Sequence, residues 1–214
     1  MLDPVGKEGL HFFGVMTASI SHEIKNRMAI INEQAGLLED LVSMSRQGRE
    51  IDVSRIERLA ASVKAQIQMA DTIIKTMNRF AHSIDTMTHP ADLNETVALS
   101  ILLFKRTAGN REIQLTGMSC DSPVSVTTAP FLLMNLLWHW LAAVMETASR
   151  NASVTIGAEP APDGAVITIK WESQGEGTPP PALPDEAAAL RQILKVSAIR
   201  TDENAMILSL PRAL

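Results

Sequence analysis

The sequence predicts an α+β protein in which a long antiparallel helical hairpin precedes an α/β sandwich domain. Before Pro90 the only proline is Pro4, and apolar residues recur every three or four positions, as they do in packed helices. After Pro90, prolines are frequent, and short runs of alternating polarity predict strands between helices. We therefore expect an N-terminal segment 1–9, a helical hairpin 10–88 and a second domain 89–214.

The first helix of the hairpin is predicted from apolar residues that advance by three or four positions. These residues are Phe13, Met16, Ile20, Ile24, Met28, Ile31, Ala35, Leu38 and Val42. Residues 45–49 contain Gly48 and predict the turn that ends this helix.

The second helix of the hairpin is more regular than the first. Its apolar positions lie alternately four and three residues apart: Ile56, Ala60, Val63, Ile67, Ala70, Ile74, Met77, Ala81 and Ile84. Such a sustained seam is typical of coiled-coil packing. Ser54 and Glu57 fit the capping-box pattern at its start, and Asp52 is an alternative cap. Because a lone hairpin leaves much of this seam in water, we expect a homodimer that forms a four-helix bundle.

The second domain is predicted to mix helices and strands. Helices are expected at 93–106, 130–148 and 186–198, and strands at 112–116, 153–157, 165–171 and 205–210. The Asp163-Gly164 dipeptide predicts the turn between the second and third of these strands.

The composition excludes several classes of protein. The net charge of −5 argues against a nucleic-acid binder, and the single cysteine, Cys120, excludes disulfides and a four-cysteine zinc site. The start of the chain lacks the basic and apolar runs of a secretory signal. The most apolar stretch, 129–145, is short for a membrane span and contains Asn135 and His139. We therefore expect a cytoplasmic protein with no membrane partner.

The segment from Ser21 to Asn26 is the sharpest local feature. His22 and Asn26 lie four residues apart and share a helix face, away from the apolar seam. The zinc motif H-E-x-x-H would require a second histidine at Asn26, so we expect no metal site. An exposed imidazole is a good nucleophile toward a phosphoryl group. Glu23 could orient the ring and take its proton, and Asn26 could hold a hydrolytic water. The alternative is a surface histidine beside a charged neighbour.

This segment resembles the phosphoacceptor box of sensor histidine kinases, Ser-His-Glu-x-(Arg/Lys)-(Asn/Thr)-Pro-Leu. The matching residues are Ser21, His22, Glu23, Lys25 and Asn26, whereas Arg27 and Met28 replace Pro-Leu. Residues 93–95 look like the start of the kinase ATP-binding domain, so the resemblance extends from about residue 10 to residue 212. It implies that His22 is a phosphoacceptor and that 89–214 is a reduced ATPase-like domain.

The nucleotide site that the family resemblance implies is degenerate. Asn135 matches one asparagine of the family, but a second asparagine, which binds magnesium, is replaced by His139. Imidazole is a poor ligand for magnesium, so His139 is expected to be a core histidine with a hydrogen bond. Ser173 replaces the aspartate that would bind adenine, ahead of Gly175 and Gly177. The family's nucleotide lid and second glycine-rich loop have no counterpart after Gly177. We therefore expect no ATP or magnesium to bind, and the partner to supply magnesium.

The resemblance is strongest to dimeric histidine phosphotransferases of phosphorelays. It implies that His22 relays phosphoryl groups between response-regulator receivers, with Ser19, Lys25 and Arg27 contacting the receiver. Three alternatives remain open: a receiver phosphatase, a dimeric scaffold that binds a receiver or a sensor kinase, and, last, an active histidine kinase.

Overall fold

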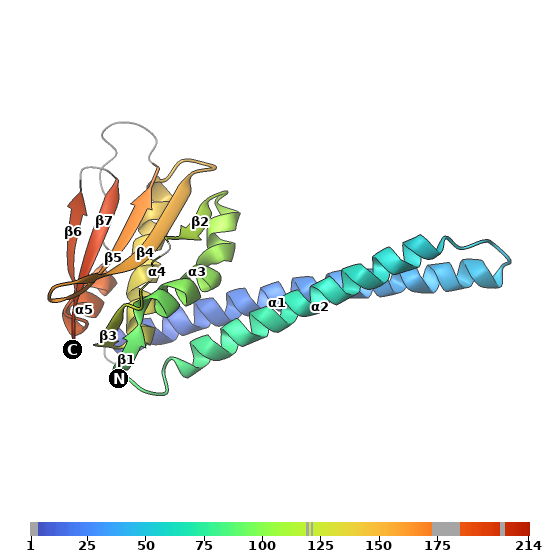
Figure 1. Cartoon of the computed structure of the whole chain (residues 1–214). Helices are drawn as coiled ribbons and strands as arrows, with labels where there is room; N and C mark the ends of the chain where they lie inside the picture. The colour runs from blue at the N-terminus through green and yellow to red at the C-terminus, as the bar shows by residue number, and fades with distance from the viewer. Residues whose placement is uncertain (1–3, 119, 121, 173–184, 202–203) are drawn as a thin grey trace. The chain divides into compact units, whose positions relative to one another are not determined.

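A computed structural model describes residues 4–118, 120, 122–172, 185–201 and 204–214. The predicted α+β class is confirmed: a pair of long helices precedes a mixed sheet with its own helices (Figure 1). The contacts divide the chain into two compact units. One comprises Met1–Gly14 and Arg79–Leu214, and the other Val15–Asn78.

The two helices of the hairpin are α1 (Pro4–Arg46) and α2 (Val53–His82). Helix α1 begins at Pro4, inside the segment 1–9 that was predicted to precede it, because proline is favourable in the first turn of a helix. The predicted turn at 45–49 is confirmed. Gly48 has φ +77°, Arg49 donates its N–H to the Met44 carbonyl at 3.1 Å, and Gly48 donates to Ser45 at 2.9 Å. This is the hydrogen-bond pattern of a Schellman motif.

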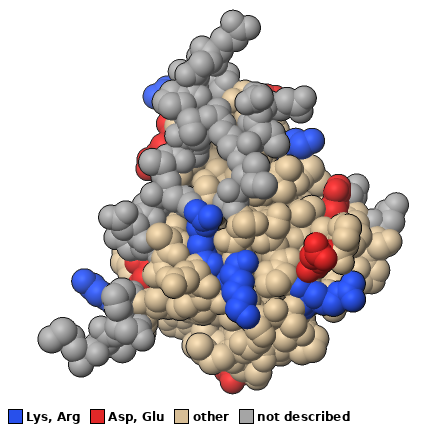
Figure 2. All heavy atoms as spheres, turned by 90° about the vertical axis from the view of Figure 1, so that its left-hand side faces the viewer, with Lys and Arg blue, Asp and Glu red and all other residues tan. Residues whose placement is uncertain are grey.

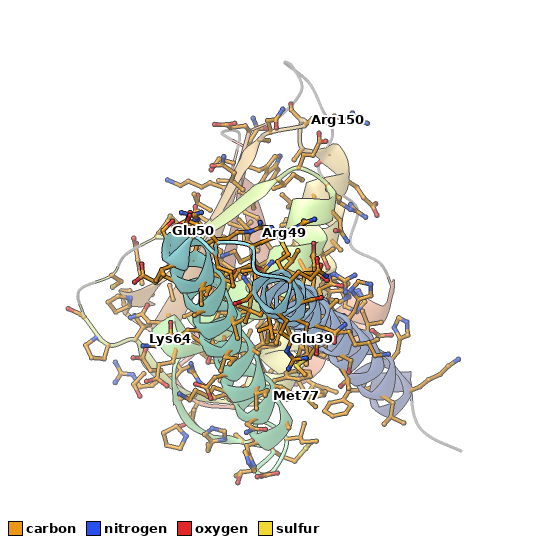
Figure 3. The ribbon with its side chains drawn as sticks, turned by 90° about the vertical axis from the view of Figure 1, so that its right-hand side faces the viewer. Glu39, Arg49, Glu50, Lys64, Met77 and Arg150 are labelled. Atoms are coloured by element: carbon orange, nitrogen blue, oxygen red, sulfur yellow. The ribbon has the colours of Figure 1, made fainter. Side chains whose placement is uncertain are left out.

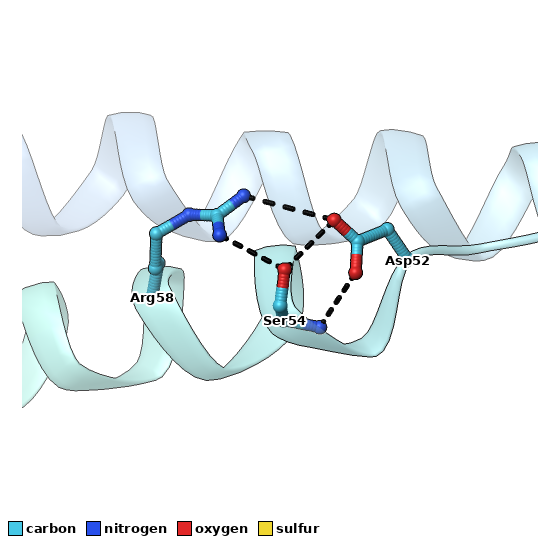
Figure 4. Close-up of polar contacts among 3 residues, drawn as sticks. All are labelled: Asp52, Ser54 and Arg58. Atoms are coloured by element: carbon cyan, nitrogen blue, oxygen red, sulfur yellow. Dashed lines mark hydrogen bonds and ion pairs between the residues drawn. The ribbon is translucent and has the colours of Figure 1, made fainter.

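Asp52 caps the N-terminus of α2. Its Oδ1 accepts from the Ser54 backbone N–H at 2.9 Å, and its Oδ2 accepts from the Ser54 hydroxyl at 2.8 Å (Figure 4). The capping box predicted from Ser54 and Glu57 is therefore wrong, and the alternative cap is correct, because α2 begins one residue before Ser54. The hydrogen bonds from Ser54, its hydroxyl first, hold the pKa of Asp52 below the ordinary value.

The second domain contains a five-stranded sheet in the order β2-β4-β5-β7-β6, with β2 parallel to β4 and the other neighbours antiparallel. A separate antiparallel ribbon pairs β1 with β3. The strands are β1 (His89–Asp92), β2 (Gln114–Gly117), β3 (Ser125–Thr128), β4 (Ser153–Ala161), β5 (Gly164–Trp171), β6 (Ser197–Thr201) and β7 (Ala205–Pro211). The helices are α3 (Leu93–Asn110), α4 (Pro130–Thr147) and α5 (Asp185–Ile193).

Most predicted elements of this domain are confirmed, but its C-terminal part differs. The helix predicted at 186–198 ends at Ile193, and β6 begins at Ser197. Lys195 takes a left-handed conformation, φ 51°, which ends the helical path and turns the chain into β6 at the edge of the sheet. Strands β1 and β3 were not predicted.

The helices of the second domain cover one face of its sheet (Figure 1). Buried side chains alternate with more exposed ones along β5, along the first four residues of β4 and along β7 after its first residue, so each strand contributes one side to the core. The predicted turn between β4 and β5 requires Gly164, because a Cβ there would clash with the Leu210 carbonyl oxygen.

Phenylalanine side chains join the base of the hairpin to this domain. The Phe12 ring lies 5.5 Å from Phe80, 6.3 Å from Phe104 and 5.6 Å from Phe131, measured between centroids. Phe12, Phe80 and Phe104 are almost completely inaccessible to solvent. Both ends of the hairpin therefore belong to the unit that contains the sheet, whereas the predicted ranges divide the chain at residues 9 and 88.

None of the described helices combines the length and the hydrophobicity needed to cross a bilayer. Figure 2 shows one face of the molecule, where Lys and Arg occur in separate groups, interspersed with Asp and Glu and with uncharged surface. The described residues of that face form no continuous basic stripe of the kind that follows a nucleic-acid backbone.

Candidate functional site

His22 lies on the solvent-exposed side of α1. Asn26 and Ala29 are exposed on the same line, and Val15 and Ser19 are half-buried. The imidazole makes no hydrogen bond or ion pair with any residue that the structure describes. Both ring nitrogens are therefore accessible to a reacting group or a partner.

The neighbours of His22 in sequence face a different side of α1. The inner face, which packs within the hairpin, includes Ile20 and Leu41, both buried. Glu23 and Arg27 continue this face at steps of three and four residues, and their side chains are 36% and 29% exposed. A helix turns by about 100° per residue, so Glu23 does not face His22 although the two are adjacent.

Glu23, Arg27 and Gln66 form a polar cluster inside the hairpin. Arg27 Nη2 lies 3.7 Å from Glu23 Oε1, and Arg27 Nη1 donates to Gln66 Oε1 of α2 at 3.2 Å. The Nε of Arg27 is buried and has no hydrogen-bond partner in the part of the chain that the structure describes. Arg27 is thus directed into the hairpin rather than toward a partner, and Glu23 is paired with Arg27. Gln66 was not among the predicted residues, and its signal in the sequence is a polar residue three positions after Val63 and four before Ala70.

The other predicted contact residues lie nearer to His22. Lys25 is exposed three residues after His22, which places it on the same side of α1. Ser19 is half-buried three residues before His22. The structure therefore brings Ser19, Lys25 and Asn26 together around His22, and it separates them from Glu23 and Arg27.

The predicted apolar seam of α2 does not coincide with its contact face within the chain. That contact face is marked by Leu59, Ala70 and Phe80, which are buried, with half-buried residues between them. Ile67 and Ile74 of the predicted seam are 54% and 45% exposed. Half of the seam therefore faces solvent, as expected for a hairpin by itself.

An apolar groove runs along this exposed side of the hairpin. It is lined by Leu38, Ala60, Val63, Lys64, Ile67 and Gln68. An adjoining hollow shares Leu38 and adds Glu39 and Val42 from α1. In Figure 3, which views the hairpin from its tip, Glu39 and Lys64 are labelled on the two helices, and Arg49 and Glu50 lie in the connection between them.

The residues predicted for the degenerate nucleotide site have other surroundings where they are described. Asn135 is fully buried in α4, and neither of its amide atoms has a hydrogen-bond partner among the described residues. His139 Nε2 lies 2.9 Å from Glu8 Oε1 of α1, which confirms the expected hydrogen bond, and the His139 side chain is 15% exposed. Ser173, Gly175 and Gly177 lie outside the described residues.

The comparisons with known proteins give structural neighbours only. No family model matches the chain, and no curated protein matches it. The catalytic domain of the histidine kinase ThkA is 12% identical, with a TM-score of 0.49, and the match covers 60% of this chain and 99% of that one. ThkA in complex with the response regulator TrrA is 15% identical, with a TM-score of 0.47, over 97% of this chain and 64% of that one. A bacterial phosphotransferase is 17% identical, with a TM-score of 0.47, over 92% and 94%.

Histidine kinases are therefore among the structures that this chain resembles, in agreement with the resemblance noted in the sequence. Because the identities are below 25% and the TM-scores below 0.5, this likeness leaves the activity open. The function has to be inferred from the site on the hairpin.

Proposed function

We propose that this chain is a histidine phosphotransferase of two-component signalling, with His22 as its phosphoacceptor. The observation that carries the proposal is an exposed imidazole, without a partner among the described residues, on a long helix with Asn26 on the same face. A ring nitrogen would attack the phosphorus of an aspartyl phosphate on a receiver domain. The bond between phosphorus and the aspartate oxygen would break, the carboxylate would leave, and the ring would lose its other proton to Glu23 or water. The reverse reaction would pass the phosphoryl group to a second receiver.

The surroundings of His22 are suited to this partner. Lys25 places an exposed positive charge on the histidine side, where it can attract a phosphoryl group and the acidic pocket of a receiver. Magnesium would be held by the receiver and not by this chain. Ser19 would lie at the edge of the same contact.

A homodimer is the second part of the proposal. The groove along the hairpin is apolar, and two-fold symmetry would place this surface against its own copy. Lys64 on its α2 side and Glu39 beside it on α1 have opposite charges, so the surface is self-complementary. Dimerisation through it would cover Ile67 and give the four-helix bundle expected from the seam.

We further propose that the chain does not use ATP itself. Two observations support this. Asn135 faces the core, and His139, at the position of the magnesium-binding asparagine of the kinases, is held by Glu8. A receiver phosphatase is the second candidate function, and the exposed amide of Asn26 favours it because an amide can position a hydrolytic water.

The test uses the full chain and radiolabelled phosphate. The protein is first incubated with labelled ATP and magnesium, and then with a panel of receiver domains labelled on aspartate. We expect no label from ATP and an acid-labile, base-stable label from at least one receiver. His22→Ala should abolish the label. His82→Ala is the matched control, because His82 is exposed and paired with Asp85.

Labelling by ATP alone would establish a kinase instead. Loss of phosphate from the receiver without labelling of the chain would establish the phosphatase. A receiver that binds but keeps its phosphate would establish a scaffold.

A further inference from the structure

We infer that Arg27 is a positioning residue that controls whether the Glu23 carboxylate can reach His22. In the phosphoacceptor box of the kinases, proline stands at this position, whereas this chain has an arginine whose guanidinium contacts Glu23 and Gln66. The inference deepens the proposed function, but its first test does not require phosphoryl transfer.

Helix geometry makes Glu23 dependent on its neighbours. Residues adjacent in a helix do not face each other, so Glu23 must turn outward from the inner face to accept a hydrogen bond from the His22 ring. The carboxylate is at the border between the two faces, since its side chain is 36% exposed. The long side chain of Glu23 allows its carboxylate to rotate outward toward His22. The residue that pairs with Glu23 on the inner face determines what fraction of the time it does so.

Arg27 is that partner, and it is itself anchored. It lies one helical turn after Glu23, in the favourable order with the acid first, at 3.7 Å. Its bond of 3.2 Å to Gln66 ties the guanidinium to α2, and Arg27 is only 29% exposed. A guanidinium fixed in this way attracts the carboxylate inward, away from the His22 ring. At rest, His22 therefore lacks the carboxylate that would increase its nucleophilicity.

The test measures the acylation of His22 by diethyl pyrocarbonate, followed by peptide mass analysis. A ring nitrogen attacks the carbonyl carbon, ethyl carbonate leaves and decomposes to ethanol and carbon dioxide, and the other ring proton is released. Arg27→Gln should raise the rate at His22 by about twofold to fivefold, the change in population that loss of one weak helical ion pair allows. Adding Glu23→Gln should cancel the rise, and Glu23→Gln alone should change the rate little.

Two variants separate positioning from general charge. Lys75→Ala removes an ion pair of the same helical spacing, with Asp71 at 2.7 Å, without touching Glu23, and its rate should equal that of the unmodified chain. Arg27→Lys keeps the pair with Glu23 and should restore the slow rate. An unchanged rate in Arg27→Gln would overturn the inference, as would a similar rise in Lys75→Ala. An equal loss of acylation rate on Glu23→Gln in the unmodified chain and in Arg27→Gln would also overturn it, because Glu23 would then already contact His22 in the presence of Arg27.

Gln66→Ala covers the case in which Arg27→Gln fails to fold, judged by circular dichroism. It frees Arg27 from α2 without changing any charge, so a smaller rise in the same direction is expected, and a folded variant without a rise would refute the inference. Phosphorylation by phosphoramidate is the second measurement. If acylation follows the predicted order but no phosphohistidine forms, the proposed function fails and the role of Arg27 stands.

Discussion

The exposed half of the α2 seam gives a quantitative prediction for dimer formation. Fully burying an isoleucine side chain contributes about 1.5–3 kcal/mol, and Ile67 retains 54% of its exposure in the single chain. Covering the rest in a dimer is then worth about 0.8–1.6 kcal/mol per copy, and two-fold symmetry doubles this value. Ile67→Ala should therefore raise the dissociation constant by about fifteenfold to two-hundredfold.

Ile67→Asp is the stronger perturbation, because it also places two carboxylates near each other in an apolar groove. We expect a monomer at micromolar concentration by sedimentation equilibrium, with an unchanged helical circular dichroism signal, since the residue is half exposed in the single chain. Leu102→Asp is the matched control: Leu102 is 44% exposed on α3, outside the hairpin. It should leave the dimer intact. An unmodified chain that stays monomeric at all concentrations would refute the reasoning, and so would equal dissociation by both variants.

Three further predictions concern single residues. His22→Ala should remove phosphorylation yet shift the free energy of unfolding by under about 0.5 kcal/mol, because the side chain is exposed. A large loss of stability, measured by urea denaturation, would instead indicate a structural role for His22. Asp52→Ala should destabilise α2 most above pH 3.8, the ordinary pKa of the carboxyl. The difference in melting temperature from the unmodified chain should vanish as pH falls through the lowered pKa of Asp52. A difference in melting temperature that does not depend on pH would contradict the cap. His139→Ala should cost about 1–3 kcal/mol in urea denaturation, because Glu8, only 13% exposed, loses its hydrogen bond, whereas His82→Ala should cost almost nothing.

The periodicity of the sequence was sufficient to predict the long helices, because strands and loops do not place apolar residues at alternating steps of three and four over such a length. It was not sufficient to predict which stripe packs within the chain. Helix α2 has two overlapping stripes that share Val63, Ala70 and Met77. One is completed by Leu59 and Phe80 inside the hairpin, and the other by residues that face solvent. Which of the two stripes packs within the chain depends on how α1 is aligned against α2, and the periodicity of α2 does not specify this alignment.

The elements that the sequence failed to predict depend on distant partners. Strand β1 spans four residues, His89–Asp92, and its extended shape comes from pairing with Ser125–Thr128 of β3. The first two residues of β6, Ser197 and Ala198, were assigned to the helix predicted at 186–198 because the residues before them have helical periodicity, but the edge of β7 was available for pairing. Neither strand has the alternating apolar residues that would predict it without its partner.

The candidate site shows the same limit on a smaller scale. The resemblance at residues 21–28 treats the motif as one chemical unit, but successive residues of a helix point about 100° apart. His22 and Asn26 face solvent, and Glu23 and Arg27 face Gln66 in α2. Met28 is exposed on the apolar side, where it continues toward Leu38 at helical spacing. The motif therefore contributes to three surfaces.

These three surfaces separate three effects that a single activity assay would combine. Changes at His22 or Asn26 should alter transfer or hydrolysis without altering assembly. Changes at Met28 should alter assembly and leave the reactivity of the monomer's histidine intact. Changes at Arg27 should alter the reactivity of His22 only while Glu23 is present, since the guanidinium touches the carboxylate and not the ring. A variant in the motif is thus interpretable once its helix face is known, and the face follows from its position relative to His22 in steps of three and four residues.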